Sequence, residues 1–141
     1  MNIYFACSIT GGRAFEAAYQ EITRALLADQ HEVPTAHLAE SNVMALERVI
    51  DPRGVYERDV AWIRACDALI AEVSVPSHGV GYEIGFALEQ SKPVLCLAQE
   101  GLAVSKMITG NPHPALQMKY YQNVAEGIAL IREFLSDVIC E

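Results

Sequence analysis

The 141-residue sequence predicts an α/β domain in which a five-stranded parallel sheet carries helices on both faces. Short apolar runs alternate along the chain with segments whose apolar residues recur at helical spacing. The run at residues 68–73 is apolar almost throughout, as expected of a central parallel strand that is buried on both faces. Strands that alternate with helices form right-handed βαβ units, and such units build a parallel sheet.

The first half of the chain is expected to contain two strands and two helices. Residues 3–6 form a β-prone run that leads into a glycine loop at residues 7–13, and helical spacing follows over residues 15–27. Residues 32–36 are a candidate second strand, which Pro34 restricts to a sheet edge. The polar stretch 38–54, with a turn signal at residues 51–54, is expected to be a loop with room for one helical turn. Helical spacing returns over residues 55–66.

The second half is expected to continue the alternation after the central strand at residues 68–73. A loop rich in Ser, Pro and Gly covers residues 74–80, and a helix over residues 81–90 leads to a buried strand over residues 93–97. After a mixed region, residues 117–121 are the predicted fifth strand. Asn123 is expected to cap a final amphipathic helix that ends near residue 135.

Length and composition indicate a single domain over residues 1–141, because domains of roughly 100–150 residues are typical. Apolar residues make up 52% of the sequence, and no run approaches the roughly 20 apolar residues of a membrane-spanning helix. The N-terminus has no signal-peptide pattern, so we expect a cytoplasmic protein without a membrane partner. The formal charge of −8 argues against nucleic acid as a partner, since such proteins neutralise phosphates with Lys and Arg.

The Cys and His residues do not predict a metal site or a disulfide framework. The four cysteines stand far apart without a C-x-x-C pair, and the four histidines lack metal-ligand spacing. Glycines within residues 77–85 superficially match a dinucleotide-binding fingerprint, but that motif belongs after the first strand of a sheet. We therefore expect neither a metal nor another cofactor.

The expected binding site lies outside the carboxyl ends of the strands, where ligands of parallel α/β sheets bind. The loop after the first strand can direct backbone N–H groups, a hydroxyl and a guanidinium at a phosphate, although a plain β–α turn would look the same. Its candidate residues are Ser8, Ile9, Thr10 and Arg13. Ser77 and Ser105 are further hydroxyl donors, and His37 stands at the end of the predicted second strand, facing the site.

Two carboxylates are candidates for chemistry. Glu83 is expected in the first turn of the helix over residues 81–90, where the helix dipole favours the charged form; it is either a nucleophile or an ordinary first-turn Glu. Asp59 is either a solvated surface charge or a second carboxylate that moves a proton, as in glycosidases. Tyr4, in the first strand, would by itself count as a core residue.

In combination, residues 4–13, 35–37, 59–62, 71–73, 76–77, 79–85 and 105–108 resemble the 2′-deoxynucleoside 5′-phosphate N-hydrolase family of the nucleoside 2-deoxyribosyltransferase superfamily. Their order and spacing match across nearly the whole chain. The resemblance implies a Rossmann-like, doubly wound fold and a homodimer that acts on a small deoxynucleotide. Its product would be a free base, released from the 5′-monophosphate by hydrolysis of the N-glycosidic bond.

The same resemblance implies a role for each matching residue. Glu83 attacks the anomeric carbon and forms a deoxyribosyl ester that water hydrolyses, Asp59 assists proton transfer to the base, and Tyr4 positions or polarises Glu83. His37 lies against the base or the sugar. The 5′-phosphate is held by Ser8, Ile9, Ser77, Gly79 and the partner's Ser105. Two departures concern this phosphate site, since Cys7 stands where the family usually has Gly and Thr10 where it often has Arg.

Two other functions fit the same residues. Nucleoside 2-deoxyribosyltransferases share Tyr, Asp and Glu at these places but pass the sugar to a second base, and Ser77 and Ser105 favour the phosphate-specific hydrolase over them. A non-catalytic nucleotide-binding module on this fold is the other alternative, in which Glu83 merely binds the sugar. A phosphoribohydrolase of the cytokinin-activating type would need a Gly-Gly-x-Gly-Thr segment, which the sequence lacks.

Overall fold

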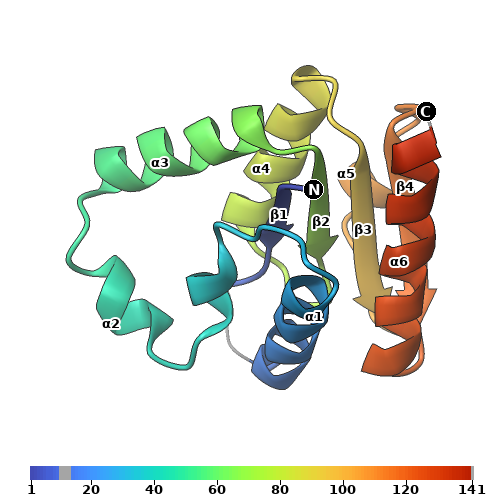
Figure 1. Ribbon diagram of the computed structural model, residues 1–141, viewed down its shortest axis with the longest axis horizontal. Coiled ribbons are helices and arrows are strands. Elements are labelled where there is room, and N and C mark those ends of the chain that lie inside the picture. The colour runs from blue at the N-terminus through green and yellow to red at the C-terminus, as the bar shows by residue number, and fades with distance from the viewer. Residues whose placement is uncertain (10–13, 141) are drawn as a thin grey trace.

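A parallel sheet forms the centre of the computed structural model, which describes residues 1–9 and 14–140, the side chain of Leu46 excepted (Figure 1). Its strands are β1 (Ile3–Ala6), β2 (Ala68–Glu72), β3 (Val94–Gln99) and β4 (Leu116–Tyr121). They lie in the order β1-β2-β3-β4, and each neighbouring pair is parallel. The predicted central strand is confirmed, because β2 lies between β1 and β3 and every one of its residues is buried.

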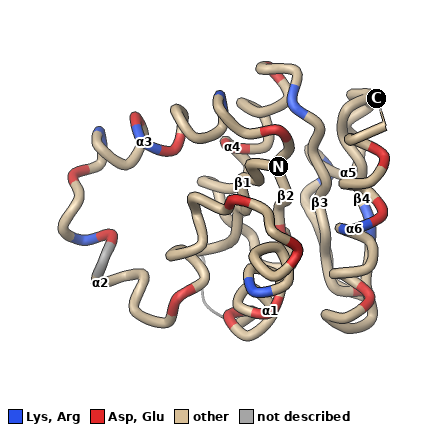
Figure 2. The backbone as a smooth tube through the Cα atoms, in the orientation of Figure 1, with Lys and Arg blue, Asp and Glu red and all other residues tan. Residues whose placement is uncertain are grey.

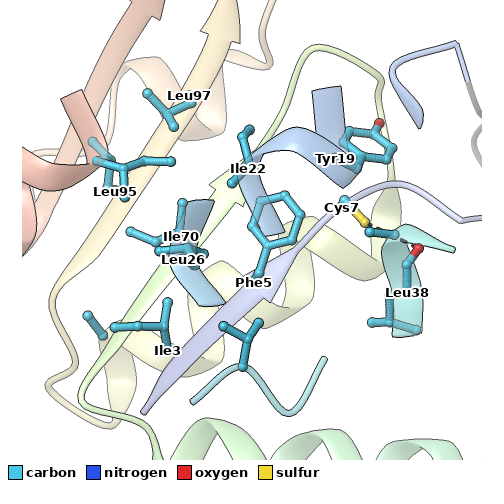
Figure 3. Close-up of a cluster of buried hydrophobic side chains, with 14 of the residues drawn as sticks. Ile3, Phe5, Cys7, Tyr19, Ile22, Leu26, Leu38, Ile70, Leu95 and Leu97 are labelled. Carbon is cyan, nitrogen blue, oxygen red and sulfur yellow. Dashed lines mark hydrogen bonds between the residues drawn. The ribbon is translucent and has the colours of Figure 1, made fainter. Parts of the chain in front are cut away.

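Helices cover both faces of the sheet, as predicted (Figure 1). Alternate residues of a strand point to opposite faces, so Ile3 and Phe5 pack with α1 (Glu16–Ala28) and α6 (Val124–Cys140). Figure 3 shows Phe5 and Tyr19 in this cluster. Their rings meet edge-on, with centroids 6.4 Å apart. Tyr4 and Ala6 point to the other face, where they pack with residues of α3 (Pro52–Ala65) and α4 (His78–Glu89). Burial of each large side chain contributes roughly 1.5–3 kcal/mol.

The predicted strand over residues 32–36 is wrong, and the described sheet has four strands rather than five. Only one parallel bridge remains there, between Asn2 and Glu32. Pro34 has no N–H to donate to a ladder, and the Phe5 N–H is instead bonded by the Thr35 hydroxyl oxygen at 3.0 Å. A side chain thus replaces the backbone carbonyl that a fifth strand would have supplied, and the chain is free to turn away.

The segment from residue 36 to residue 51 is more helical than predicted. It contains a 3₁₀ helix, η1 (Ala36–Ala39), and the short α2 (Val43–Glu47). The predicted turn at residues 51–54 is the start of α3: the Asp51 side chain accepts from the Gly54 N–H at 2.8 Å, and Pro52 takes a first-turn position. The short α5 (Lys106–Thr109) was not expected from the sequence.

The final helix confirms its predicted start but not its predicted end. The Asn123 side chain accepts from the Glu126 N–H at 3.0 Å, which is the expected cap. The helix then continues to Cys140, five residues beyond the predicted end, and its last turns carry the partly buried Val138. None of the helices in the described part of the chain is long and apolar enough to cross a membrane.

The connections of β1 place a crevice at one end of the sheet. After β1 the chain passes the outer edge, where Glu32 bridges Asn2, and then returns to form β2 on the opposite side of β1. In α/β sheets, ligands bind outside the carboxyl ends of strands at the point where connections leave in opposite directions. Residues that follow β1 and β2 therefore border the expected site.

We predict that Thr35→Val destabilises the protein by about 1–3 kcal/mol, because the buried Phe5 N–H loses its acceptor while the side-chain shape is kept. The free energy of unfolding from urea titration measures this. Thr109→Val is the matched control, since the Thr109 hydroxyl is exposed, and it should change the value by less than about 0.5 kcal/mol. Equal values for the two variants would contradict the role given to Thr35.

Candidate active site

A pocket of about 390 Å³ opens at the carboxyl ends of β1 and β2, within the usual size of small-molecule sites. One wall comes from η1, α2 and the residue after it, the other from α3 and the first turns of α4. The lining residues are Cys7, Ile9, Leu38, Met44, Glu47, Arg48, Val55, Asp59, Ser77, His78, Gly79, Val80 and Glu83. Both carboxylates selected from the sequence, Asp59 and Glu83, therefore line one pocket.

Glu83 is held by a hydrogen bond from the sheet. The hydroxyl of Tyr4, a fully buried residue of β1, donates to Glu83 Oε1 at 2.7 Å. Glu83 follows Val80 by three residues and precedes Ala87 by four, so it shares the helix face that packs on the sheet. A residue that would count as core from sequence thus directs its hydroxyl at a side chain that lines the pocket.

The predicted place of Glu83 in its helix is wrong. The helix begins at His78, because the Ser77 hydroxyl oxygen accepts from the Val80 N–H at 3.4 Å, and Glu83 is its sixth residue. The dipole of the first turn therefore does not account for its charge. Burial raises the pKa of Glu83 to about 7; the Tyr4 hydrogen bond opposes this rise, and the Asp59 charge adds to it.

Tyr4 remains a proton donor over the whole range in which Glu83 titrates. Burial, and then the neighbouring charges of Glu83 and Asp59, raise the pKa of Tyr4 far above its usual value. Its bond engages Oε1 of Glu83, whose side chain lines the pocket, and does not involve Oε2. The pair therefore offers one carboxylate oxygen, held in place, to a ligand.

Asp59 is not the solvated charge that its sequence context allowed. Its side chain is 15% exposed, and its Oδ1 accepts from Arg58 Nε at 2.8 Å. Arg58 in turn donates to both carboxylate oxygens of Glu47, at 3.0 and 3.3 Å. Burial raises the pKa of Asp59, and the hydrogen bond from Arg58 opposes that rise.

His37 lies beside the site, but on a different element from the one predicted. It belongs to η1, and its Nε2 is 3.1 Å from Glu47 Oε1. Its ring packs edge-on against Trp62 of α3, at 5.9 Å between centroids. His37 thus contacts Glu47, which lines the pocket.

The candidate anion-binding residues divide into three groups. Ile9, Ser77 and Gly79 line the pocket, and Ser8 is fully buried two residues after the end of β1. Thr10 and Arg13 lie outside the described residues. Ser105 caps α5 and lines a second cavity, of about 440 Å³, which shares Ser77, His78 and Val80 with the first but contains neither Asp59 nor Glu83.

Arg58 and Glu47 are site residues that the sequence analysis did not identify. Arg58 stands in a charged run on α3, and Figure 2 shows acidic and basic residues alternating along this helix. Spacing alone does not tell which of these charges face inward. Glu47 lies in a stretch that was predicted as a loop. Among the described residues, no group of three or more His, Cys, Asp and Glu side chains is arranged to hold a metal ion.

Comparisons with known proteins give a consistent set of relatives. Residues 3–123 match the model of the nucleoside 2-deoxyribosyltransferase family. A protein of Methanococcoides burtonii named "Putative 2′-deoxynucleoside 5′-phosphate N-hydrolase 1" is 36% identical over 121 residues, which are 86% of this chain and 99% of that protein. The 5-hydroxymethyl-dUMP N-hydrolase of Danio rerio is 37% identical over 126 residues, 86% of this chain and 87% of that protein.

Two solved structures share the fold. The solution structure of BlsM has a TM-score of 0.79 at 20% identity and covers 98% of this chain and 91% of its own. The CMP N-glycosidase BcmB of Clostridium botulinum has a TM-score of 0.70 at 19% identity and covers 94% of this chain and 99% of its own. The likeness extends over nearly all of each chain, so the whole described domain has this fold.

We predict that Tyr4→Phe raises the pKa of Glu83 above about 7, because the variant lacks the hydrogen bond that stabilises the ionised carboxylate in the wild type. At pH 7 a smaller fraction of Glu83 is then ionised. A ¹³C NMR titration of the labelled Glu side chains measures this, with the Glu83 resonance identified by its loss in Glu83→Gln. Tyr120→Phe, at an exposed tyrosine, is the control and should leave the titration in place. A lower pKa in Tyr4→Phe would refute this account.

Proposed function

This chain belongs to the nucleoside 2-deoxyribosyltransferase family, and we propose that it hydrolyses the N-glycosidic bond of 2′-deoxynucleoside 5′-monophosphates. The products are the free base and 2-deoxyribose 5-phosphate. The observation that carries the proposal is the Tyr4–Glu83 pair in a pocket that Asp59 also lines. The names of the relatives, which are N-hydrolases of deoxynucleotides, support the reaction and the substrate class.

Glu83 is the proposed nucleophile. Its free carboxylate oxygen attacks C1′ of the deoxyribose, a C1′–O bond forms as the C1′–N bond breaks, and the electron pair of the broken bond leaves with the base. Water then attacks C1′, which breaks the ester and regenerates the carboxylate. A sugar without a 2′-hydroxyl readily develops positive charge at C1′, and a carboxylate held beside C1′ stabilises that charge.

Asp59 and Tyr4 support this nucleophile in different ways. Asp59 is the proposed donor of a proton to the departing base and the acceptor of a proton from the attacking water. Tyr4 fixes one oxygen of Glu83 through its 2.7 Å hydrogen bond and lowers the pKa of that carboxyl group, so that more of it is ionised near neutral pH. His37 is proposed to lie at the base or sugar, on the side of Glu47.

The 5′-phosphate is proposed to bind at the start of α4. The N–H groups of His78 and Gly79 precede the first helical hydrogen bond, and the positive end of the helix dipole favours an anion there. The loop of Ser8 and Ile9, with Thr10 and Arg13, supplies further donors from β1. Because the protein carries a formal charge of −8, such local donors must overcome an unfavourable overall field.

A homodimer is proposed to complete the phosphate site. Ser105 of one chain lines a cavity separate from its own Glu83, as described above. The Met107 side chain beside it is 84% exposed, so α5 offers an apolar side chain to such an interface. A two-fold interface that covers α5 would bring the partner's Ser105 to the phosphate.

Base exchange is the second candidate function, because the matching family model describes a transferase. The same Glu83 ester would then react with an acceptor base in place of water. The donors at the start of α4 favour the monophosphate as substrate, because a site built to hydrogen-bond a phosphate discriminates against a ligand that leaves its donors unpaired.

We predict that the protein releases free base from 2′-deoxynucleoside 5′-monophosphates and that Glu83→Ala lowers kcat by at least about a thousandfold, since the covalent step is lost. Chromatography of the released base measures this for a panel of deoxynucleotides, nucleosides and ribonucleotides. Glu89→Ala, at an exposed glutamate of the same helix, is the matched control. Release only after an acceptor base is added would establish the transferase, and binding without release under any condition would favour a nucleotide-binding module.

We predict that mixed Glu83→Ala and Ser105→Ala subunits recover activity that neither variant has alone. In the heterodimer, the Ser105→Ala chain keeps its own Glu83 and receives an intact Ser105 from the Glu83→Ala chain. One of the two sites is therefore complete. Activity is measured after denaturation and refolding of the two variants together, beside each variant refolded alone. If Ser105 acted within its own chain, the mixture would be no more active than the average of the two.

A further inference from the structure

Arg58 joins two carboxylates that come from opposite walls of the pocket. Its Nε donates to Asp59 Oδ1 at 2.8 Å, while Nη1 and Nη2 donate to the two oxygens of Glu47. The exposed fractions of the three side chains are 19% for Arg58, 15% for Asp59 and 14% for Glu47. The guanidinium group also lies over the ring of Trp62, 4.9 Å from its centroid. This arrangement is a half-buried network rather than a solvated surface ion pair.

Arg58 contacts Asp59 and Glu47 through different N–H groups of its guanidinium. Consecutive residues on a helix point in different directions, so their side chains do not ordinarily face each other. Glu47 holds the guanidinium from the opposite side through two parallel hydrogen bonds, and Trp62 supports its face. With the guanidinium fixed in this way, its remaining Nε–H is directed at Asp59.

On this geometry, and resting on the hydrolase reaction proposed above, we propose that Glu47 and Arg58 are positioning residues for Asp59. They hold the Asp59 carboxyl group in place at the pocket and determine how readily it gives a proton to the departing base. Because Oδ1 is engaged by Arg58, Oδ2 is the oxygen that carries the proton. Neither Glu47 nor Arg58 forms or breaks a bond with the substrate.

Two opposing charges act on Asp59. Burial raises its pKa, the Arg58 hydrogen bond lowers it, and the Glu47 charge raises it again. Arg58 alone would favour ionised Asp59, which has no proton to give, whereas Glu47 offsets the positive charge of Arg58. Among the described residues, His37 from η1, Tyr4 from β1 and Glu83 from α4 also interact electrostatically with Asp59, and Arg48 after α2 lines the same pocket.

The proton transfer balances within this cluster. As the C1′–N bond breaks, its electron pair stays with the departing base. The base takes the proton from Asp59 Oδ2. Asp59 becomes a carboxylate beside Arg58, whose positive charge stabilises it at that moment. In the second step, Asp59 takes a proton from the attacking water and returns to its starting state.

The test compares two leaving groups. One substrate is a deoxynucleotide that the wild-type protein cleaves, and the other is 4-nitrophenyl 2-deoxyriboside 5-phosphate, whose leaving group departs as a stable anion without a proton. Glu47→Gln should lower kcat about tenfold or more for the deoxynucleotide and less than about twofold for the nitrophenyl substrate. It should also move the alkaline limb of the deoxynucleotide pH profile to lower pH, because Asp59 loses its proton more easily.

Two further variants separate positioning from folding. Arg58→Lys keeps the charge but cannot span both carboxylates, so it should also reduce cleavage of the deoxynucleotide selectively. Arg53→Gln removes an exposed arginine that pairs with Glu57 on the same helix, and it should behave as wild type. Equal losses on both substrates, or an unchanged pH profile in Glu47→Gln, would overturn the proposal.

A titration without substrate keeps this inference separate from the proposed function. In a ¹³C NMR titration of Asp-labelled protein, with the Asp59 resonance identified by its loss in Asp59→Asn, Glu47→Gln should lower the pKa of Asp59. An unchanged or higher pKa would refute the positioning role even if the enzyme is active. If wild type cleaves no deoxynucleotide, the proposed function fails, while the titration still decides whether Glu47 controls Asp59. Should Glu47→Gln not fold by circular dichroism, Arg58→Lys is titrated instead, with a higher Asp59 pKa expected from the lost guanidinium bond.

Discussion

The hydrogen bond from Tyr4 to Glu83 joins the central sheet to the carboxyl group on which the proposed chemistry depends. Tyr4 is fully buried in β1, whose backbone is fixed by its ladder to β2, so its hydroxyl has little freedom. Glu83 is fixed independently, because α4 packs on the same face of the sheet through Val80, Ile84 and Ala87. Two rigid elements therefore set the position of one oxygen atom, and the precision of the site comes from the packing of the core.

Three acidic side chains line the pocket, with Arg48 beside them. Glu47, Asp59 and Glu83 line it, and Arg58 contacts only the first two. Burial of carboxylates is unfavourable, and it raises the pKa of Asp59 and Glu83. A site of this kind is less stable than an apolar one would be, which is the usual relation between activity and stability. The same arrangement gives two carboxyl groups different surroundings, so that one can attack while the other carries a proton.

Most of the fold was predictable because parallel strands and their helices leave a local pattern. The apolar runs at β1, β2 and β3 each mark a strand that is almost wholly buried, whereas β4 is mixed in sequence and only partly buried; these four predicted strands are confirmed. Pro34 already argued against a regular strand at residues 32–36, where the prediction is wrong. The pattern did not show that the Thr35 side chain would accept from the Phe5 N–H. The helical turns η1 and α2 were also missed, because such short elements depend on tertiary contacts more than on their own propensity.

The sequence by itself determined the α/β class, the loops that border the site and the pair of carboxylates, since each follows from a periodicity or a motif read along the chain. It did not determine which charges on α3 face inward, that Glu83 sits beyond the first turn of α4, or that Arg58 and Glu47 belong to the site. Those depended on the tertiary structure. Burial and hydrogen-bond partners come from segments distant in sequence, as in the 79 residues that separate Tyr4 from Glu83, and no local pattern records them.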